Sequence, residues 1–197
     1  SLWVDDPAQW KMRPLPMLRG STLGLVGFGA IAQAIARKAL ALGLRVQAVR
    51  RSPEPLELQG VERAASVEAL FESSDHVVIA APATSGTRHL VNAELLARAK
   101  PGLHLINIAR GSLLDQEALL KALDEERIAR ATLDVTEPEP LPQGHPLYHH
   151  PRVRISPHTS AISSYVEDAL VAKIVANFKR MRAGQPLEDV LDLARGY

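Results

Sequence analysis

Short apolar stretches alternate with stretches of helical period along most of this chain. Residues 22–28, TLGLVGF, are a run of apolar and glycine residues, which favours a buried parallel strand over a strand with one solvated face. In residues 30–43, AIAQAIARKALALG, small and apolar residues recur at helical spacing, and Gly43 lies where such a helix would end. A strand followed by a helix therefore opens the pattern.

The same alternation continues to residue 156. Further strands are predicted for 45–49, 76–81, 103–109, 128–135 and 152–156, and further helices for 66–74, 92–100 and 115–126. Strands that alternate with helices of about 10 residues predict right-handed crossovers and a parallel sheet covered on both faces. We therefore predict a doubly wound α/β domain over residues 20–158.

A longer helix with an apolar stripe follows this domain. It is predicted for residues 161–183, and its apolar residues recur at four-residue spacing: Ile162, Val166, Leu170, Ile174 and Phe178. The tail after it, QPLEDVLDLARGY, shows no core of its own, so we expect helix and tail to pack on another part of the protein. The chain opens on SLWVDDPAQWKMRP without an initiator Met, and we expect further sequence upstream.

Composition narrows the classes of function. A chain of 197 residues with 46% hydrophobic and 23% charged content can form one globular domain with an appendage. Its net charge of +1 and interspersed charges do not suggest a nucleic-acid or membrane partner. The absence of cysteine excludes disulfides, thiolate metal sites and cysteine nucleophiles, which fits a cytoplasmic protein, and we assign no residue to a metal.

The first chemical signal is the turn GFGAIA between the first strand and the first helix. In this G-x-G-x-x-A pattern Gly27 permits a tight turn, Gly29 lets the backbone approach a pyrophosphate, and Ala32 lets the helix pack on the sheet. A glycine turn can also be purely structural. Its place after the first strand of a βαβ unit favours dinucleotide binding.

Two arginines and a serine end the second predicted strand. This fold normally presents an acidic residue there to the adenosine ribose, whereas Arg50, Arg51 and the Ser52 hydroxyl can bind the additional phosphate of NADP. The alternative is a pair of solvated arginines on a loop.

Three later strand ends carry reactive side chains. Arg110 follows the strand 103–109 and could bind a carboxylate and polarise a carbonyl. Asp134 and Glu139 lie in and beside a proline-rich loop, and His158 follows the last strand, where it could donate a proton to a developing alkoxide. Each of these residues taken singly also fits a solvated loop position.

Several ordered motifs together resemble a known family; they are LGLVGFGAIAQAIA, AAPATSGTRHLVNAELLARAKPGLHLINIARGSLLDQEAL, ATLDVTEPEPLPQGHPLY and ISPHTSA. They are similar to the D-isomer-specific 2-hydroxyacid dehydrogenases over nearly all of residues 20–197. The resemblance implies a Rossmann-like NAD(P)-binding domain over residues 20–158. It also implies that residues 159–197 return to a substrate domain whose N-terminal part is absent from this sequence.

The resemblance also implies roles for individual residues. The catalytic Arg, Glu and His of the family fall on Arg110, Glu139 and His158, as substrate-binding group, supporting carboxylate and acid/base. Further implied contacts are Ala30 and Ile31 beside the pyrophosphate, Ala81 and Pro82 on the nicotinamide side, Ile108 and Ala109 against the cofactor, and Asp134 at the carboxamide.

Arg50 in place of an acidic residue is shared by the NADP-preferring glyoxylate/hydroxypyruvate reductases of this family. The resemblance therefore implies hydride transfer between NADP(H), preferred over NAD(H), and a small 2-oxo or 2-hydroxy acid. It further implies a homodimer, with residues 1–19, including Trp3 and Trp10, in the interface. The segment HTSA stands where HIGG is commoner, which leaves the geometry of that loop open.

Two other classes remain possible. The C-terminal-binding-protein corepressors keep this fold and the same three residue types while sensing dinucleotide and binding partners, although they prefer NAD. An unrelated enzyme of the same fold, such as a hydrolase with bound NAD, would not require Arg110, Glu139 and His158 together.

Overall fold

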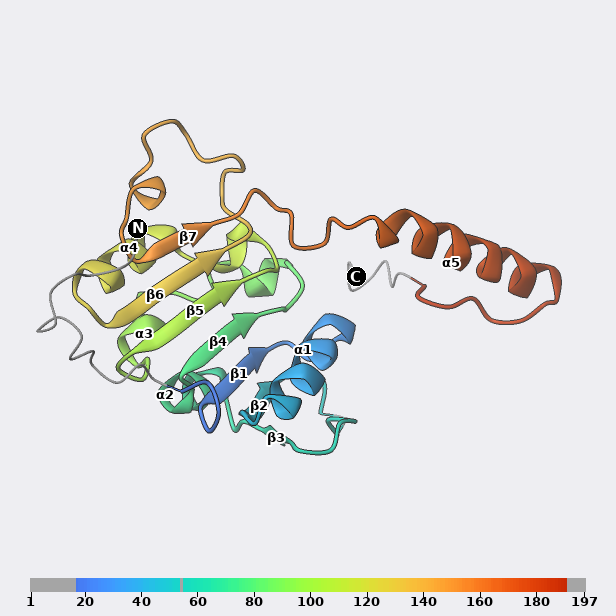
Figure 1. The fold of residues 1–197 in the computed structure, drawn as a ribbon, viewed down its shortest axis with the longest axis horizontal. Coiled ribbons are helices and arrows are strands. Elements are labelled where there is room, and N and C mark those ends of the chain that lie inside the picture. The colour runs from blue at the N-terminus through green and yellow to red at the C-terminus, as the bar shows by residue number, and fades with distance from the viewer. Residues whose placement is uncertain (1–16, 54, 191–197) are drawn as a thin grey trace, which may run out of the picture.

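The structure is a computed structural model and describes residues 17–53 and 55–190 (Figure 1). The segment with Trp3 and Trp10, expected at a dimer interface, lies outside the described residues. The described strands are β1 (Thr22–Val26), β2 (Arg45–Val49), β3 (Val61–Arg63), β4 (His76–Ile79), β5 (Leu103–Asn107), β6 (Ile128–Leu133) and β7 (Val153–Ile155). They form a 7-stranded parallel sheet in the order β3-β2-β1-β4-β5-β6-β7, which confirms the doubly wound α/β fold.

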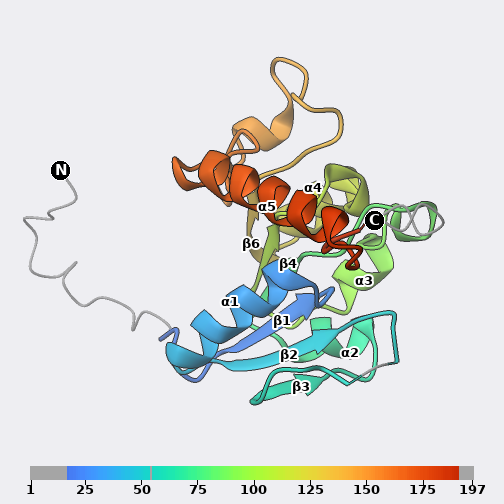
Figure 2. The ribbon, with the colours of Figure 1, turned by 90° about the vertical axis from the view of Figure 1, so that its right-hand side faces the viewer.

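The helices that connect these strands cover opposite faces of the sheet. They are α1 (Ala30–Ala41), α2 (Val67–Ser73), α3 (Ala93–Ala97) and α4 (Gln116–Asp124), with short 3-10 helices η2 (Ser85–Thr87), η3 (Gly111–Leu113) and η4 (Pro146–Tyr148). Figure 2 shows α1 on one side of β1 and α2 and α3 on the other. Small residues of α1, such as Ala32 and Ala36, pack on Leu25, and Phe71 of α2 lies in the core of the opposite face.

Side-chain caps explain where three of these helices begin. The side chains of Ser66, Asn92 and Asp115 accept hydrogen bonds from backbone N–H groups in the first turns of α2, α3 and α4. Helix α1 begins at Ala30 after the N-cap residue Gly29, with no side-chain cap and with no acidic residue in its first turn. Its N-terminal N–H groups therefore face the loop region without a side-chain acceptor.

The face that carries α1 is covered unevenly. In the described part of the chain α1 packs over β1 and β2, and no helix lies in front of β4 to β7 on that side (Figure 1). His76, His104 and Arg130 are partners in the parallel register, so their side chains share this face. Among the described residues, helices therefore lie on both faces of the sheet at β1 and β2, as predicted, and on one face at β4 to β7.

Helix α5 (Tyr165–Arg182) stands apart from the sheet (Figure 1). None of its residues is buried, and the apolar stripe predicted from the sequence is open to solvent, with Leu170 and Ile174 each 58% exposed. The tail folds back along the helix, where the Asn177 side chain bonds both backbone groups of Glu188. That this helix and tail pack on another part of the protein stays a prediction.

The differences from the predicted elements have simple causes. Strand β3 was not predicted, because it is only three residues long and Val61 is its one apolar residue. The predicted helix 161–183 begins later, at Tyr165, and several predicted strands end one or two residues earlier, since apolar residues continue beyond the last ladder pair. No described helix is long and apolar enough to span a bilayer.

Candidate active site

The predicted site residues follow the carboxyl ends of six strands and therefore lie along one edge of the sheet. In spatial order they are Arg50, Arg51 and Ser52 after β2, Gly27, Gly29, Ala30 and Ile31 after β1, Ala81 and Pro82 after β4, Ile108, Ala109 and Arg110 after β5, Asp134 and Glu139 after β6, and His158 after β7. From β1 the chain continues to β2 and β3 on one side, and it then returns to β4 on the other side of β1. The strand order therefore reverses between β1 and β4, and sheets of this kind bind ligands at that switch point. The arginine pair and the histidine lie toward opposite ends of this row.

The glycine turn after β1 has the shape that a phosphate loop requires. Gly27 has φ +93°, and a Cβ there would lie 2.8 Å from the oxygen of Ala80 and from the nitrogen of Ala81. At Gly29 a Cβ would meet nothing within 4 Å, and Ala30 and Ile31 are exposed. The uncapped start of α1 thus opens onto free space, and backbone N–H groups at a helix N-terminus bind phosphate well.

Another arginine, Arg63, lies beside the loop after β2, which the sequence analysis did not predict. Arg63, the last residue of β3, donates from both terminal nitrogens to the backbone oxygen of Ser52, at 3.4 Å each. Arg50 is half-buried and Arg51 is exposed. Because β3 was not predicted, nothing placed Arg63 beside this loop.

Arg110 is held by a buried amide. Asn107, the last residue of β5, is fully buried; its side chain donates to the Arg110 oxygen at 3.0 Å and accepts from the Ala109 nitrogen at 3.0 Å. The Arg110 guanidinium is exposed and donates to the Ala109 oxygen at 2.6 Å. Sequence reasoning missed Asn107, although a polar residue inside the apolar run LHLINIA was the available signal.

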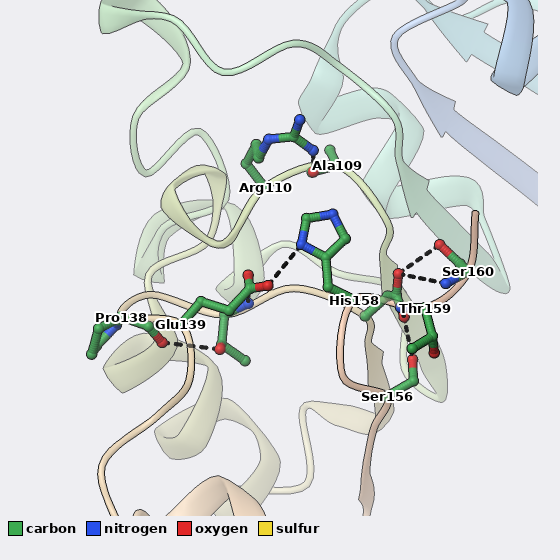
Figure 3. Close-up of polar contacts among 10 residues, drawn as sticks. Ala109, Arg110, Pro138, Glu139, Ser156, His158, Thr159 and Ser160 are labelled. Atoms are coloured by element: carbon green, nitrogen blue, oxygen red, sulfur yellow. Dashed lines mark hydrogen bonds and ion pairs between the residues drawn. The ribbon is translucent and has the colours of Figure 1, made fainter. Parts of the chain in front are cut away.

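Glu139 and His158 form a direct pair (Figure 3). The Nδ1 atom of His158 lies 2.7 Å from Oε1 of Glu139, and the two side chains are 45% and 40% exposed. The second carboxylate oxygen of Glu139 accepts from the Thr136 nitrogen at 3.4 Å. In Figure 3 the other ring nitrogen of His158 points toward the loop of Ala109 and Arg110.

The backbone at His158 is left-handed, with φ +53°, and Asp134 holds it there. The His158 nitrogen donates to the Asp134 backbone oxygen at 2.9 Å. The Asp134 carboxylate accepts four hydrogen bonds, from Ser156 Oγ at 2.5 Å, the Thr159 nitrogen at 3.0 Å, and the nitrogen and Oγ of Ser160 at 3.1 and 2.6 Å. Ser160 belongs to the HTSA segment whose geometry the sequence left open, and it supplies half of these bonds.

These hydrogen bonds dominate the electrostatics of Asp134. Burial, which leaves the residue 4% exposed, opposes ionisation, but the bonds from Ser156, Ser160 and Thr159 outweigh it and lower the pKa of Asp134 to about 2. Both carboxylate oxygens already have two donors each. The expected contact of Asp134 with a nicotinamide carboxamide stays a prediction.

The residues between these groups form the middle of the row. Ala81, Ile108 and Ala109 are half-buried, and Pro82 is exposed while its backbone oxygen accepts from Thr87 Oγ1 at 2.8 Å. A pocket of about 350 Å³ also opens beside the Glu139–His158 pair, bordered by Asp134, Leu141 and Tyr148. Across residues 17–53 and 55–190 no cluster of three or more His, Asp or Glu side chains could hold a metal ion.

The site contains the guanidinium of Arg110 and a histidine that is paired with a carboxylate. A guanidinium can polarise a carbonyl, and a histidine with a carboxylate on one ring nitrogen can transfer a proton through the other. The structure brings Glu139 and His158 into contact and sets Arg110 on the adjacent loop (Figure 3), whereas Arg50 and Arg51 lie at the far end of the sheet edge.

The chain is similar in sequence to known proteins. A glyoxylate/hydroxypyruvate reductase A from Serratia proteamaculans is 38% identical over 197 residues, covering 98% of this chain and 62% of that protein. The chain thus spans less than two thirds of the length of this curated relative.

The chain is also similar to solved structures. An NADPH-dependent glyoxylate/hydroxypyruvate reductase from Sinorhizobium meliloti, in complex with NADP and sulfate, is 34% identical with a TM-score of 0.86, covering 96% of this chain and 61% of that one. A D-isomer specific 2-hydroxyacid dehydrogenase from Xanthobacter autotrophicus, in complex with NADPH and MES, is 36% identical with a TM-score of 0.84, covering 94% and 76%.

The family described as "D-isomer specific 2-hydroxyacid dehydrogenase, NAD binding domain" matches residues 3–160. This range includes every strand of the sheet and the loops that carry Arg110, Glu139 and His158. The chain therefore belongs to the D-isomer specific 2-hydroxyacid dehydrogenases and contains their NAD-binding domain.

Proposed function

We propose that this protein transfers a hydride between NADP(H) and a small 2-oxo or 2-hydroxy acid, with glyoxylate or hydroxypyruvate as the first substrates to test. The observation that carries the proposal is the 2.7 Å contact between His158 and Glu139 beside the loop of Arg110. Names of similar proteins, which include glyoxylate/hydroxypyruvate reductases, support the substrate class.

His158 acts as the acid/base in this proposal. Its Nδ1–H donates to Glu139, which fixes the ring orientation and leaves Nε2 to face the substrate oxygen. In the reductive direction Nε2–H gives its proton to the alkoxide oxygen as the C–H bond forms. The Glu139 carboxylate stabilises the charged imidazolium before this transfer.

Arg110 binds and polarises the 2-oxo acid. A planar guanidinium can contact a carboxylate and a carbonyl oxygen together, and its fixed charge stabilises the oxyanion that develops during reduction. Asn107 supports this role because its side chain bonds the Ala109 nitrogen and the Arg110 oxygen, the backbone groups before and after the Ala109–Arg110 peptide.

The described residues fit a dinucleotide. The open position at Gly29 and the uncapped start of α1 suit a pyrophosphate, with Gly27, Ala30 and Ile31 around it. Arg50, Arg51 and Ser52 are proposed to bind the 2′-phosphate, which makes NADP(H) the preferred cofactor, and relatives solved with NADP or NADPH support this. Ala81, Pro82, Ile108, Ala109 and Asp134 are assigned to the nicotinamide end, where the bound cofactor supplies the hydride.

We assign residues 20–158 to the cofactor domain and residues 159–197 to a substrate domain. The exposed apolar stripe of α5 supports this assignment, since such a stripe normally lies against another surface. A homodimer with residues 1–19 in its interface and a cytoplasmic location are also part of the proposal.

The activity is tested with the complete protein. Nicotinamide absorbance is followed with glyoxylate, hydroxypyruvate and longer 2-oxo acids, with NADPH and NADH in parallel. We expect oxidation of NADPH, and a loss of about 100-fold or more in kcat for His158→Asn, because general acid catalysis contributes about that much. No oxidation with any acid, while the dinucleotide still binds, would favour a dinucleotide-sensing binding module instead.

The cofactor preference has a separate test. The double variant Arg50→Asp, Arg51→Ala should weaken NADPH binding by about 2–3 kcal/mol through loss of charge-assisted hydrogen bonds, while NADH binding changes much less. The matched control is Arg37→Ala on the exposed side of α1. Equal losses for both cofactors, measured by titration calorimetry, would exclude the phosphate role.

A further inference from the structure

We propose that Gln116 is a positioning residue of the active site. Its side-chain amide fixes the Glu137 backbone and thereby holds the Glu139–His158 pair in place beside the loop of Arg110. This inference rests on the proposed roles of these three residues. Gln116 is the first residue of α4 and does not itself touch Glu139, His158 or Arg110 in any described hydrogen bond.

The contact uses both ends of the amide. Nε2 of Gln116 donates to the Glu137 backbone oxygen at 2.5 Å, and Oε1 accepts from the Glu137 nitrogen at 3.1 Å. The loop residue thus receives the pairing that a neighbouring strand would give it. Replacing the amide leaves both backbone groups without this partner.

The backbone at Glu137 is connected to His158 through Thr136 and Glu139. The backbone N–H of the neighbouring residue, Thr136, donates to Oε2 of Glu139 at 3.4 Å. The other oxygen of the same carboxylate lies 2.7 Å from Nδ1 of His158. A shift of the Thr136–Glu137 backbone therefore moves the carboxylate relative to the imidazole ring.

The same stretch of backbone also contacts the arginine loop. A Cβ on Gly111, the residue after Arg110, would lie 2.1 Å from the Thr136 carbonyl carbon and 2.6 Å from the Glu137 nitrogen. Only glycine allows the two loops to approach this closely. Residues 110–116 therefore meet the Glu139 loop at two points, Gly111 by direct packing and Gln116 by hydrogen bonds.

Other contacts do not replace this clamp. Arg88 forms an ion pair with the Glu137 side chain at 2.8 Å, but the two side chains are 57% and 39% exposed, and exposed ion pairs are weak in water. Gln116 and Glu137 also border a pocket of about 440 Å³, so packing around this contact is incomplete. Among the described hydrogen bonds, those to the Glu137 backbone come from the Gln116 amide, which acts beside the packing of Gly111.

The test compares three variants. Gln116→Met keeps the length of the side chain and its helix propensity but makes neither strong hydrogen bond, Gln116→Glu keeps an acceptor for the Glu137 nitrogen, and Glu117→Gln is the matched control at the exposed neighbouring position. The first readout needs no turnover: the downfield proton resonance of Nδ1–H in His158, assigned by its loss in Glu139→Gln. The second is the split between kcat and KM in the complete protein.

We expect the Nδ1–H resonance to broaden or move upfield in Gln116→Met, less in Gln116→Glu and not in Glu117→Gln. We expect kcat to fall by up to about a hundredfold in Gln116→Met, with KM for NADPH unchanged, because small displacements of catalytic groups cost rates of that order. A native resonance and native kcat in both folded Gln116 variants would overturn the proposal. If wild type turns over no 2-oxo acid, the proposed function fails, and the resonance still decides the role of Gln116.

Discussion

Two carboxylates act on the loop that carries His158, and burial separates their roles. Asp134 is buried and accepts four hydrogen bonds from Ser156, Thr159 and Ser160, so it holds the shape of the loop. Glu139 is 40% exposed and contacts the imidazole ring directly. Substitution of Asp134 should therefore mainly lower the free energy of unfolding, whereas substitution of Glu139 should mainly change the orientation of the His158 ring.

We predict that Asp134→Asn destabilises the fold in a pH-dependent way. The pKa of Asp134 is lowered from 3.8 to about 2, so its ionised form stabilises the native state above about pH 4, and this contribution of about 2 kcal/mol disappears as the pH falls toward 2. Urea unfolding of both proteins between neutral and acid pH measures it. The difference between wild type and variant should shrink below about pH 4.

The control for this prediction is Thr159→Ala, because Thr159 contributes only its backbone nitrogen to the Asp134 network. It should leave the pH dependence unchanged. A destabilisation by Asp134→Asn that stays constant down to the lowest pH would show that the charge of Asp134 is not what the four donors stabilise.

Residues at strand ends were predictable from the sequence to different degrees. The glycine turn and the strand-end positions of Arg110, Glu139 and His158 follow from local pattern and family motifs. Gln116 does not, because it acts through the backbone of Glu137, which folding brings near from 21 residues away. Arg63 was missed for the same reason, since its contact with Ser52 depends on the unpredicted pairing of β3 with β2. Asn107 bonds backbone groups only two and three residues away, so its polar side chain in an apolar strand was the signal that could have identified it.

At the scale of elements, the sheet carries a second titratable site on the side of β4 to β7 that no described helix covers. The rings of His76 and His104 meet edge to face with centroids 5.7 Å apart, and Nε2 of His104 lies 2.9 Å from Thr132 Oγ1. Burial, followed by the nearby His76 and Arg130, lowers the pKa of His104 from 6.5 to about 4. The native sheet therefore favours the neutral ring.

We predict that His104 makes the fold sensitive to mild acid. The unfolded chain binds the proton at about pH 6.5 and the folded chain only near pH 4, so stability is full above about pH 6.5 and is lost as the pH falls between these values, by at most about 3 kcal/mol. His104→Gln keeps a partner for Thr132 and does not titrate. Its unfolding free energy should change less with pH across this window.

Urea unfolding at several pH values checks this, with His149→Gln in an exposed loop as the control. Parallel pH curves for wild type and His104→Gln would contradict it. The pattern of apolar residues predicted β4 and β5 well, but it could not reveal this pair, because His76 and His104 become neighbours only through the register of the two strands.

At the scale of the whole molecule, the strand order separates the two tasks of the site. The β2 end carries the arginines proposed to select the cofactor, the β1 end carries the glycine turn proposed to bind the pyrophosphate, and the β5, β6 and β7 ends carry Arg110, Glu139 and His158. Substitutions that alter cofactor choice should therefore be separable from those that alter catalysis. The fold class was predictable because each strand and helix of the βαβ units has its own local pattern of apolar residues. The packing partner of α5 is not encoded in any local pattern.

The last prediction concerns that helix. Because no residue of α5 is buried, the double variant Leu170→Gln, Ile174→Lys should change the unfolding free energy of this chain by no more than about 0.5 kcal/mol, as for other surface substitutions. Leu119→Gln in α4 is the matched contrast: Leu119 is fully buried, and its loss should cost about 3 kcal/mol or more. Urea unfolding measures both, and sedimentation velocity should show weaker self-association of the double variant at high concentration, because it removes part of an exposed apolar stripe. A cost for the double variant comparable with that of Leu119→Gln would mean that α5 packs on the sheet domain in solution.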